Sequence, residues 1–71
     1  MKLKKLLKHM VDLQQVTIYD IKTNEDYFTN EIVSEITNLH FDGFLSNMKV
    51  NEIYTPCEYI DVIFIGVERE V

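Results

Sequence analysis

The chain has 71 residues, with 46% hydrophobic and 27% charged side chains and a formal net charge of −5. A chain of this length forms a single small globular domain, residues 1–71, and buries only about 60% of the surface that its unfolded form exposes. The composition excludes a disordered segment, and the net negative charge argues against direct nucleic-acid binding, whose affinity depends on basic side chains that release phosphate counterions.

Residues 1–11 predict an amphipathic helix. Its apolar stripe has the i, i+3, i+4, i+7 spacing of one helix face and consists of Leu3, Leu6, Leu7 and Met10. A helix of about 16 Å is marginal on its own, so the stripe predicts a surface elsewhere in the chain on which it packs. The four lysines around this stripe, Lys2, Lys4, Lys5 and Lys8, are then a solvated face. Binding to a membrane surface is the alternative, but the stripe lacks the Trp or Phe side chains that anchor a helix at an interface.

Residues 14–21, "QQVTIYDI", predict a strand because β-branched and aromatic residues dominate them. The stretch "KTNED" at 22–26 predicts a turn, since Asn24 and Asp26 have side chains that bond to their own backbone in turns. "DYFT" at 26–29 then returns as a second strand. Together these segments predict a hairpin.

A second helix is predicted after this hairpin. Thr29 or Asn30 is suited to cap it, and Glu31 is favourably placed in its first turn, near the positive end of the helix dipole. Its apolar stripe continues along Ile32, Val33, Ile36 and Leu39 or His40. Helical spacing then resumes at Phe41, Phe44, Leu45 and Met48. The sequence leaves open whether one helix passes through Gly43 or a short helical turn follows it.

The stretches "KVNEIYTP" at 49–56 and "EYIDVIFIGVE" at 58–68 predict two further strands around a turn at Pro56–Cys57–Glu58. Pro56 ends the first of them because it has no N–H group to donate to a sheet. The second contains a continuous apolar run, Val62, Ile63, Phe64 and Ile65. Such a run is typical of a strand in the middle of a sheet, with both faces covered.

These elements predict an α+β domain in the order helix, strand, strand, helix, strand, strand, with two helices packed on a small antiparallel sheet of three to four strands. On the last strand, Val62 and Phe64 point to one face and Ile63 and Ile65 to the other. Two short helices cover one face only. A second copy of the chain would cover the other, which predicts a homodimer and supplies the extra stabilisation that small domains often need.

No pattern in the sequence indicates catalytic or metal-binding chemistry. It has no Gly-rich phosphate loop, no nucleophile elbow and no ligands at metal-binding spacing. Cys57 would act as a nucleophile only beside His9 or His40, and its neighbour Glu58 disfavours the thiolate that a nucleophile requires. We therefore expect no enzyme activity, no catalytic residue, no metal and no cofactor.

The tyrosines are the first candidates for a binding surface. Tyrosine beside carboxylates is good interface material, since its ring buries a large area at little cost in entropy. With the apolar run of the last strand they give the predicted interface residues, Tyr19, Tyr27, Tyr54, Tyr59, Ile63 and Phe64. The alternative is that these strands simply carry tyrosine as strands often do.

A second candidate surface is acidic. Five carboxylates near the first hairpin and the second helix are close enough in sequence to share one face: Glu25, Asp26, Glu31, Glu35 and Asp42. Such a face would imitate the phosphates of a nucleic acid and block a DNA-binding enzyme. The alternative is an ordinary solvated surface, on which Glu31 and Glu35 repel each other only slightly.

The stretches "MKLKKLLKHM", "VTIYD" and "IDVIFIGVE" resemble short uncharacterised α+β proteins of phages and mobile elements of low-GC Gram-positive bacteria. The resemblance spans nearly the whole chain and supplies no catalytic residues. It implies a small accessory or inhibitory protein that acts by binding a host protein.

We therefore expect a small non-enzymatic protein-binding module whose partner is a protein, either the chain itself or a host protein. The alternatives are a structural homo-oligomeric subunit without a separate partner and the acidic nucleic-acid mimic. A cytoplasmic location without membrane attachment is expected, because the chain opens without the apolar run of an export signal, contains no membrane-spanning stretch and has a single cysteine.

Overall fold

The computed structural model describes residues 1–39, 43, 47–56 and 61–69. Its elements are α1 (Leu3–Lys8), β1 (Gln15–Asp20), β2 (Asp26–Ile32), α2 (Val33–Leu39), β3 (Met48–Tyr54) and β4 (Val62–Arg69). The predicted α+β class and the predicted order of the elements are both confirmed. In the predicted turn after β3, Cys57 and Glu58 lie outside the described residues.

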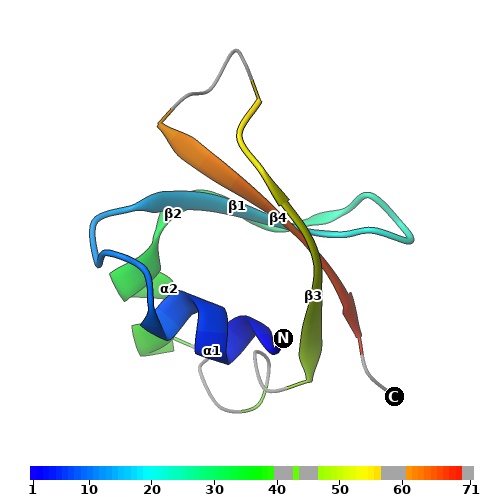
Figure 1. Ribbon diagram of the computed structural model, residues 1–71, viewed down its shortest axis with the longest axis horizontal. Helices are drawn as coiled ribbons and strands as arrows, with labels where there is room; N and C mark the ends of the chain where they lie inside the picture. Colours follow the sequence, from blue (N-terminus) through cyan, green and yellow to red (C-terminus); the bar gives the residue numbers. More distant parts are fainter. Residues whose placement is uncertain (40–42, 44–46, 57–60, 70–71) are drawn as a thin grey trace.

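The four strands form one sheet in the order β2-β1-β4-β3 (Figure 1). The hairpins β1–β2 and β3–β4 are antiparallel, whereas the central neighbours β1 and β4 run parallel. The sheet is therefore mixed: the expectation of an antiparallel sheet holds for the two hairpins and not for the pair that joins them. Parallel neighbours need a long crossover, which the segment from β2 through α2 to β3 supplies. The apolar strand β4 lies in the interior of the sheet, as its sequence predicts.

Both helices pack on the same face of this sheet (Figure 1). The buried side chains of this core are Leu3, Leu7, Val16, Ile18, Val33, Ile36, Met48, Ile65 and Val67. The apolar stripe of α1 is thus part of the core: Leu3 and Leu7 are fully buried, and Leu6 and Met10 pack at the margin. Full burial of one such side chain contributes about 1.5–3 kcal/mol. The surface that the stripe required is the sheet together with α2.

The second helix begins later than the predicted caps Thr29 and Asn30 imply. Both residues, and Glu31 with them, belong to β2, so the predicted cap and first turn were wrong. The Thr17 hydroxyl of β1 donates to the Asn30 side-chain oxygen at 3.1 Å and accepts the Asn30 backbone N–H at 3.1 Å. Asn30 has a left-handed backbone, φ 53°, which asparagine tolerates better than most residues. This pair keeps the chain attached to β1 at the point where a cap was expected.

Backbone carbonyls satisfy the start of α2 instead of a capping side chain. The Val33 N–H donates to the Gln14 carbonyl at 3.0 Å, and the Ser34 N–H donates to the Asp12 carbonyl at 3.1 Å. Both acceptors lie in the loop between α1 and β1. Because the first N–H groups of a helix have no partner within the helix, this loop takes the role that the sequence assigned to a side chain.

Met48 is the first residue of β3 and is fully buried, although its spacing from Phe44 predicted a helical position. It pairs with Arg69 of β4. Apolar spacing along the chain does not reveal a partner strand that arrives later in the sequence, so the helical assignment of Met48 was wrong. The question of a helix through Gly43 falls mostly on residues 40–42 and 44–46, which lie outside the described residues.

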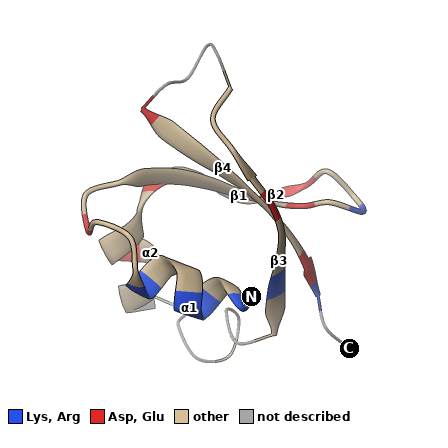
Figure 2. Ribbon diagram, in the orientation of Figure 1, with Lys and Arg blue, Asp and Glu red and all other residues tan. Residues whose placement is uncertain are grey.

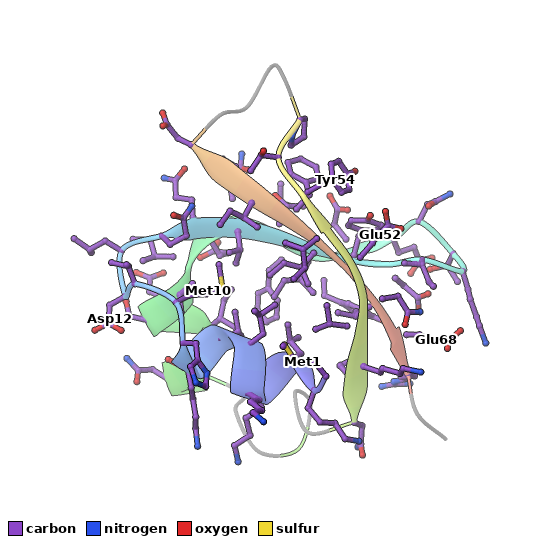
Figure 3. All side chains as sticks on the ribbon, viewed as in Figure 1. Met1, Met10, Asp12, Glu52, Tyr54 and Glu68 are labelled. Carbon is purple, nitrogen blue, oxygen red and sulfur yellow. The ribbon has the colours of Figure 1, made fainter. Side chains whose placement is uncertain are left out.

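The first two residues add a short piece of chain to the edge of the sheet. Lys2 forms an antiparallel bridge with Lys49, and the Val50 N–H donates to the Met1 carbonyl at 2.8 Å. Figure 3 shows Met1 between α1 and β3. An open strand edge invites pairing with other chains, so this contact protects the first half of β3, while residues 51–54 are exposed.

Candidate functional site

The face of the sheet opposite the helices is the candidate site. On β4, Ile63 and Ile65 point to the helices: Ile65 is fully buried, and Ile63 packs at the margin of the core. Val62 and Phe64 alternate with them and point to the open face, where Gly66 presents only its backbone. The predicted division of this strand is thus confirmed, and the structure identifies the isoleucines as its core side.

Three aromatic rings from three strands meet on the open face. The ring centroids of Tyr19 (β1) and Tyr54 (β3) are 6.4 Å apart with an interplanar angle of 76°, an edge-to-face arrangement. Those of Tyr54 and Phe64 (β4) are 5.5 Å apart at 39°. Both distances lie in the range where aromatic pairs attract each other. Tyr54 is nevertheless 44% exposed, so it presents the accessible part of the group.

Gly66 lies beneath this group and lets side chains from two other strands close over β4. A Cβ atom at Gly66 would meet Cγ of Glu52 at 2.6 Å, Cγ2 of Ile21 at 2.8 Å and the hydroxyl oxygen of Tyr19 at 2.9 Å. Real Cβ atoms do not tolerate contacts this short. The absence of a side chain at Gly66 is therefore what allows Tyr19 and Glu52 to approach each other across the strand.

The Tyr19 hydroxyl is the polar centre of the site. Its pKa is raised above the ordinary tyrosine value, first by burial, then by a hydrogen bond with Tyr54, and further by the negative charge of Glu52 and a hydrogen bond to it. Tyr19 therefore stays protonated at neutral pH and keeps a neutral hydroxyl beside the Glu52 carboxylate. Figure 3 shows Glu52 and Tyr54 close together, on the far side of the sheet from α1. We call Tyr19, Glu52, Tyr54 and Phe64 the tyrosine face.

Basic side chains gather on α1, and carboxylates gather near the β1–β2 hairpin and on the open face, although each region also holds charges of the other sign (Figure 2). The lysines at α1 are Lys2, Lys4, Lys5 and Lys8, whereas Lys49 of β3 lies opposite Glu68 and points to the open face. Carboxylates surround the β1–β2 hairpin and the open face, namely Asp20, Glu25, Asp26, Glu52 and Glu68. Lys22 offsets one of them through an ion pair with Glu68 at 3.3 Å. The tyrosine face thus includes one carboxylate, Glu52, and lies near others.

The structure separates the remaining predicted interface residues from this face. The Tyr27 hydroxyl donates to the Asp20 carboxylate at 2.9 Å, and its ring packs against the core. Burial and this hydrogen bond raise the pKa of Tyr27, and the hydrogen bond itself joins β2 to the end of β1. Ile63 belongs to the core side of β4. Tyr59 lies outside the described residues.

The five residues of the predicted acidic face do not form one patch among those that are described. Glu25 and Asp26 lie at the hairpin turn, whereas Glu31 is near the far end of β2 and Glu35 is in the first turn of α2. Asp26 and Glu31 are separated by about 17 Å of extended strand. Asp42 lies outside the described residues. The carboxylates therefore fall into two groups.

Glu52 and Gly66 belong to the tyrosine face and were not predicted. Gly66 follows Phe64 by two positions, so the strand period was a usable signal. For Glu52 the period counted from Tyr54, two positions later, was likewise a usable signal. The period counted from Val50 fails, because an irregularity between Val50 and Glu52 places Val50 against the core and Glu52 on the open face.

Within the described residues, the structure forms neither a ligand pocket nor a metal site. That part holds no pocket and no group of three or more His, Cys, Asp or Glu residues able to hold a metal ion. The His9 ring nitrogen Nδ1 is hydrogen-bonded to the Lys5 carbonyl oxygen at 2.9 Å. His40 and Cys57 lie outside the described residues. Of the helices described, neither has the length and apolar character needed to cross a membrane.

Comparison with known proteins gives no relatives. No protein-family model matches the chain, no curated protein matches it, and no solved structure matches it.

Proposed function

We propose that the chain is a small non-enzymatic protein-binding module and that the tyrosine face is its binding surface. One observation carries this proposal: aromatic rings from three strands gather on the face that the helices leave open, and Tyr54 remains 44% exposed beside a carboxylate. Aromatic residues are enriched at protein interfaces, where a few of them contribute most of the binding free energy.

The arrangement of the rings supports this proposal. Tyr54 rests on Phe64 and is met edge-on by Tyr19, so its position is set before a partner arrives. A surface that is already ordered loses less conformational entropy on binding. The three strands that carry the rings are also hydrogen-bonded to one another, which makes the platform part of the sheet and not of a loop.

The proposal also covers the kind of partner and the place where the chain binds it. The resemblance to short proteins of phages and mobile elements supports an accessory or inhibitory role in which the partner is a host protein of the bacterial cytoplasm. Contact with nucleic acid or membrane is not part of it, because the lysines of α1 lie on the helix side and the tyrosine face is acidic.

The test is capture of partners from host lysate by the immobilised chain, compared with Tyr54→Ala. The matched control is Leu13→Ala, which removes an exposed apolar side chain from the loop before β1. We expect a captured protein that is lost with Tyr54→Ala, is retained with Leu13→Ala, and binds the purified chain directly in calorimetry. Capture that is the same for all three proteins would contradict the proposal.

A structural homo-oligomer is the second candidate, and the same uncovered rings favour it. The open face exposes little of β4, however, because Val62 is only 6% exposed and Phe64 is half-buried in the single chain. Light scattering separates the two functions: a particle of twice the 8.4 kDa chain mass supports the homodimer, and a monomer at high concentration excludes it.

A further inference from the structure

We infer that the partner segment of the tyrosine face presents an arginine, whose guanidinium packs on the Tyr54 ring and pairs with the Glu52 carboxylate. The inference rests on the proposed function and names the chemistry of the partner. It joins two features that the fold places together: an exposed ring held from below, and an exposed carboxylate on the same side of the same strand.

The geometry of β3 sets the spacing of these two groups. Glu52 and Tyr54 are two residues apart in a strand, so their side chains leave the sheet on the same side, about 6.6 Å apart. A guanidinium is flat, with one face for an aromatic ring and N–H groups along its edge for a carboxylate. One arginine is therefore able to use both groups at once.

Two neighbouring rings hold the Tyr54 ring in a fixed position that suits such a contact. Phe64 supports it at 5.5 Å, and the Tyr19 ring meets it edge-on at 6.4 Å. Cations bind over the face of an aromatic ring, and arginine does so more often than lysine. The accessible part of Tyr54 is then the surface that an incoming guanidinium would cover.

The Glu52 carboxylate lacks a cation of its own within the described part of the chain. Its polar neighbour there is the Tyr19 hydroxyl, which is neutral. Glu68 provides the contrast on the same side of the molecule, because it already pairs with Lys22 at 3.3 Å. A neutral hydroxyl beside Glu52 does not cancel the charge of its carboxylate, which leaves that charge for a partner.

The charge of the molecule also favours a basic partner segment. The chain carries a formal net charge of −5, and the lysines of α1 lie on the helix side, away from the tyrosine face (Figure 2). On the open face, Lys49 lies opposite Glu68 and not opposite Glu52. A basic segment is therefore attracted to the tyrosine face and an acidic one is repelled. Two copies of the chain meeting face to face would bring Glu52 of each near the acidic surface of the other, which disfavours the homodimer as occupant.

The experiment is selection of random dodecapeptides displayed on phage against the full chain, with counter-selection on Tyr54→Ala. We expect the enriched peptides to carry arginine well above its frequency in the starting library. Synthetic peptides from this pool should bind the chain at least tenfold more weakly when Glu52→Gln is introduced or when their arginine is replaced by glutamine. Glu25→Gln removes the same charge from the hairpin turn and should leave binding within twofold.

The outcomes separate this inference from the function on which it rests. Peptides that depend on Tyr54, but lack arginine or bind Glu52→Gln as well as the unchanged chain, would overturn the inference and leave the proposed function standing. A selection without any peptide that depends on Tyr54 would contradict both. Peptides that depend on Tyr54, on Glu52 and on their own arginine support both.

Discussion

Single residues in this protein act through contacts that span strands. Gly66 makes room for three side chains over β4, and the Thr17 hydroxyl makes two hydrogen bonds to Asn30 in the neighbouring strand. Neither residue belongs to a motif. Their importance comes from what lies opposite them, and substitutions at both positions give measurable predictions.

Gly66→Ala is expected to destabilise the fold by about 1–3 kcal/mol, the usual cost of adding a methyl group where no space exists. The new Cβ atom would meet side-chain atoms of Tyr19, Ile21 and Glu52 at less than 3 Å. Urea unfolding measures the loss. Gly43→Ala is the control, since a Cβ atom there has nothing within 4 Å and alanine suits a helix better than glycine. Equal stability of Gly66→Ala and the unchanged chain would contradict this account.

Thr17→Val keeps the shape of a buried side chain, 2% exposed, and removes its hydroxyl. The Asn30 N–H then loses its acceptor and its side-chain oxygen loses a donor. We expect a loss of about 1–3 kcal/mol in the free energy of unfolding, the cost of leaving such groups unpaired. Thr23→Val in the exposed hairpin turn serves as control: its hydroxyl accepts the Glu25 N–H at 3.3 Å, but water can replace it there, so we expect a change of about 0.5 kcal/mol or less. A smaller effect at Thr17 than at Thr23 would refute the role assigned to the pair.

At the scale of elements, the protein consists of two hairpins joined side by side and covered by two short helices on one face. The loop from α1 to β1 fixes the start of α2, and the first two residues pair with β3. Each element is too short to be stable alone, so their contacts with one another decide the fold.

The first helix is expected to stabilise the domain through its buried face alone. Leu7→Ala removes a fully buried side chain and should cost about 2–5 kcal/mol, as other large-to-small core changes do. Lys5→Ala changes an exposed position of the same helix and should cost no more than about 0.5 kcal/mol. Chemical denaturation of the two variants measures both. If Leu7→Ala were as mild as Lys5→Ala, α1 would not be part of the core.

The β1–β2 hairpin is expected to lose stability in acid. The pKa of the Asp20 carboxyl is lowered mainly by the backbone N–H of Lys22, which donates to it at 2.7 Å, and also by the Tyr27 hydroxyl. A folded pKa below the unfolded value gives stability that is present above the unfolded pKa, about 4, and is lost as the pH falls through the folded pKa.

Thermal unfolding of the chain and of Asp20→Asn at pH 7 and pH 3 tests this. The difference in stability between the two proteins should be larger at pH 7 than at pH 3, because protonation removes the charge from Asp20 itself. A difference that is the same at both pH values would show that the Asp20 charge does not contribute.

At the scale of the whole molecule, one face of the sheet is core and the other is the candidate binding surface, while the lysines of α1 lie on the helix side (Figure 2). The two faces of the sheet therefore respond differently to an added charge: on one face it affects folding and on the other it affects association.

Ile63→Asp should unfold the chain, because it places a charge against the core without a partner. Tyr54→Asp should stay folded, because Tyr54 is on the open face and 44% exposed, and it should abolish any partner binding or dimer that uses this face. Circular dichroism reports folding, and light scattering with the binding assay reports association. A folded Ile63→Asp variant would mean that the core lies on the other face.

The tyrosine face was only partly predictable. Tyr19, Tyr54 and Phe64 were named from the sequence, but Tyr27, named with them, belongs to the hairpin core margin and Glu52 was missed. Residue type indicates which side chains suit an interface. It does not show which of them meet, because the register between strands depends on contacts far along the chain.

Local periodicity by itself determined the stripe of α1, the order of the elements, the interior place of β4 and the division of its side chains between two faces. Each of these follows from the geometry of one segment, where side chains recur every 3.6 or every 2 residues. The tertiary structure alone decided four other features. They are the face of β4 that became core, the parallel pairing of β1 with β4, the shift in β3 before Glu52 and the capping of α2 by a loop. They depend on pairing between distant segments, and a segment's own sequence does not encode the identity or register of the strand that it will meet.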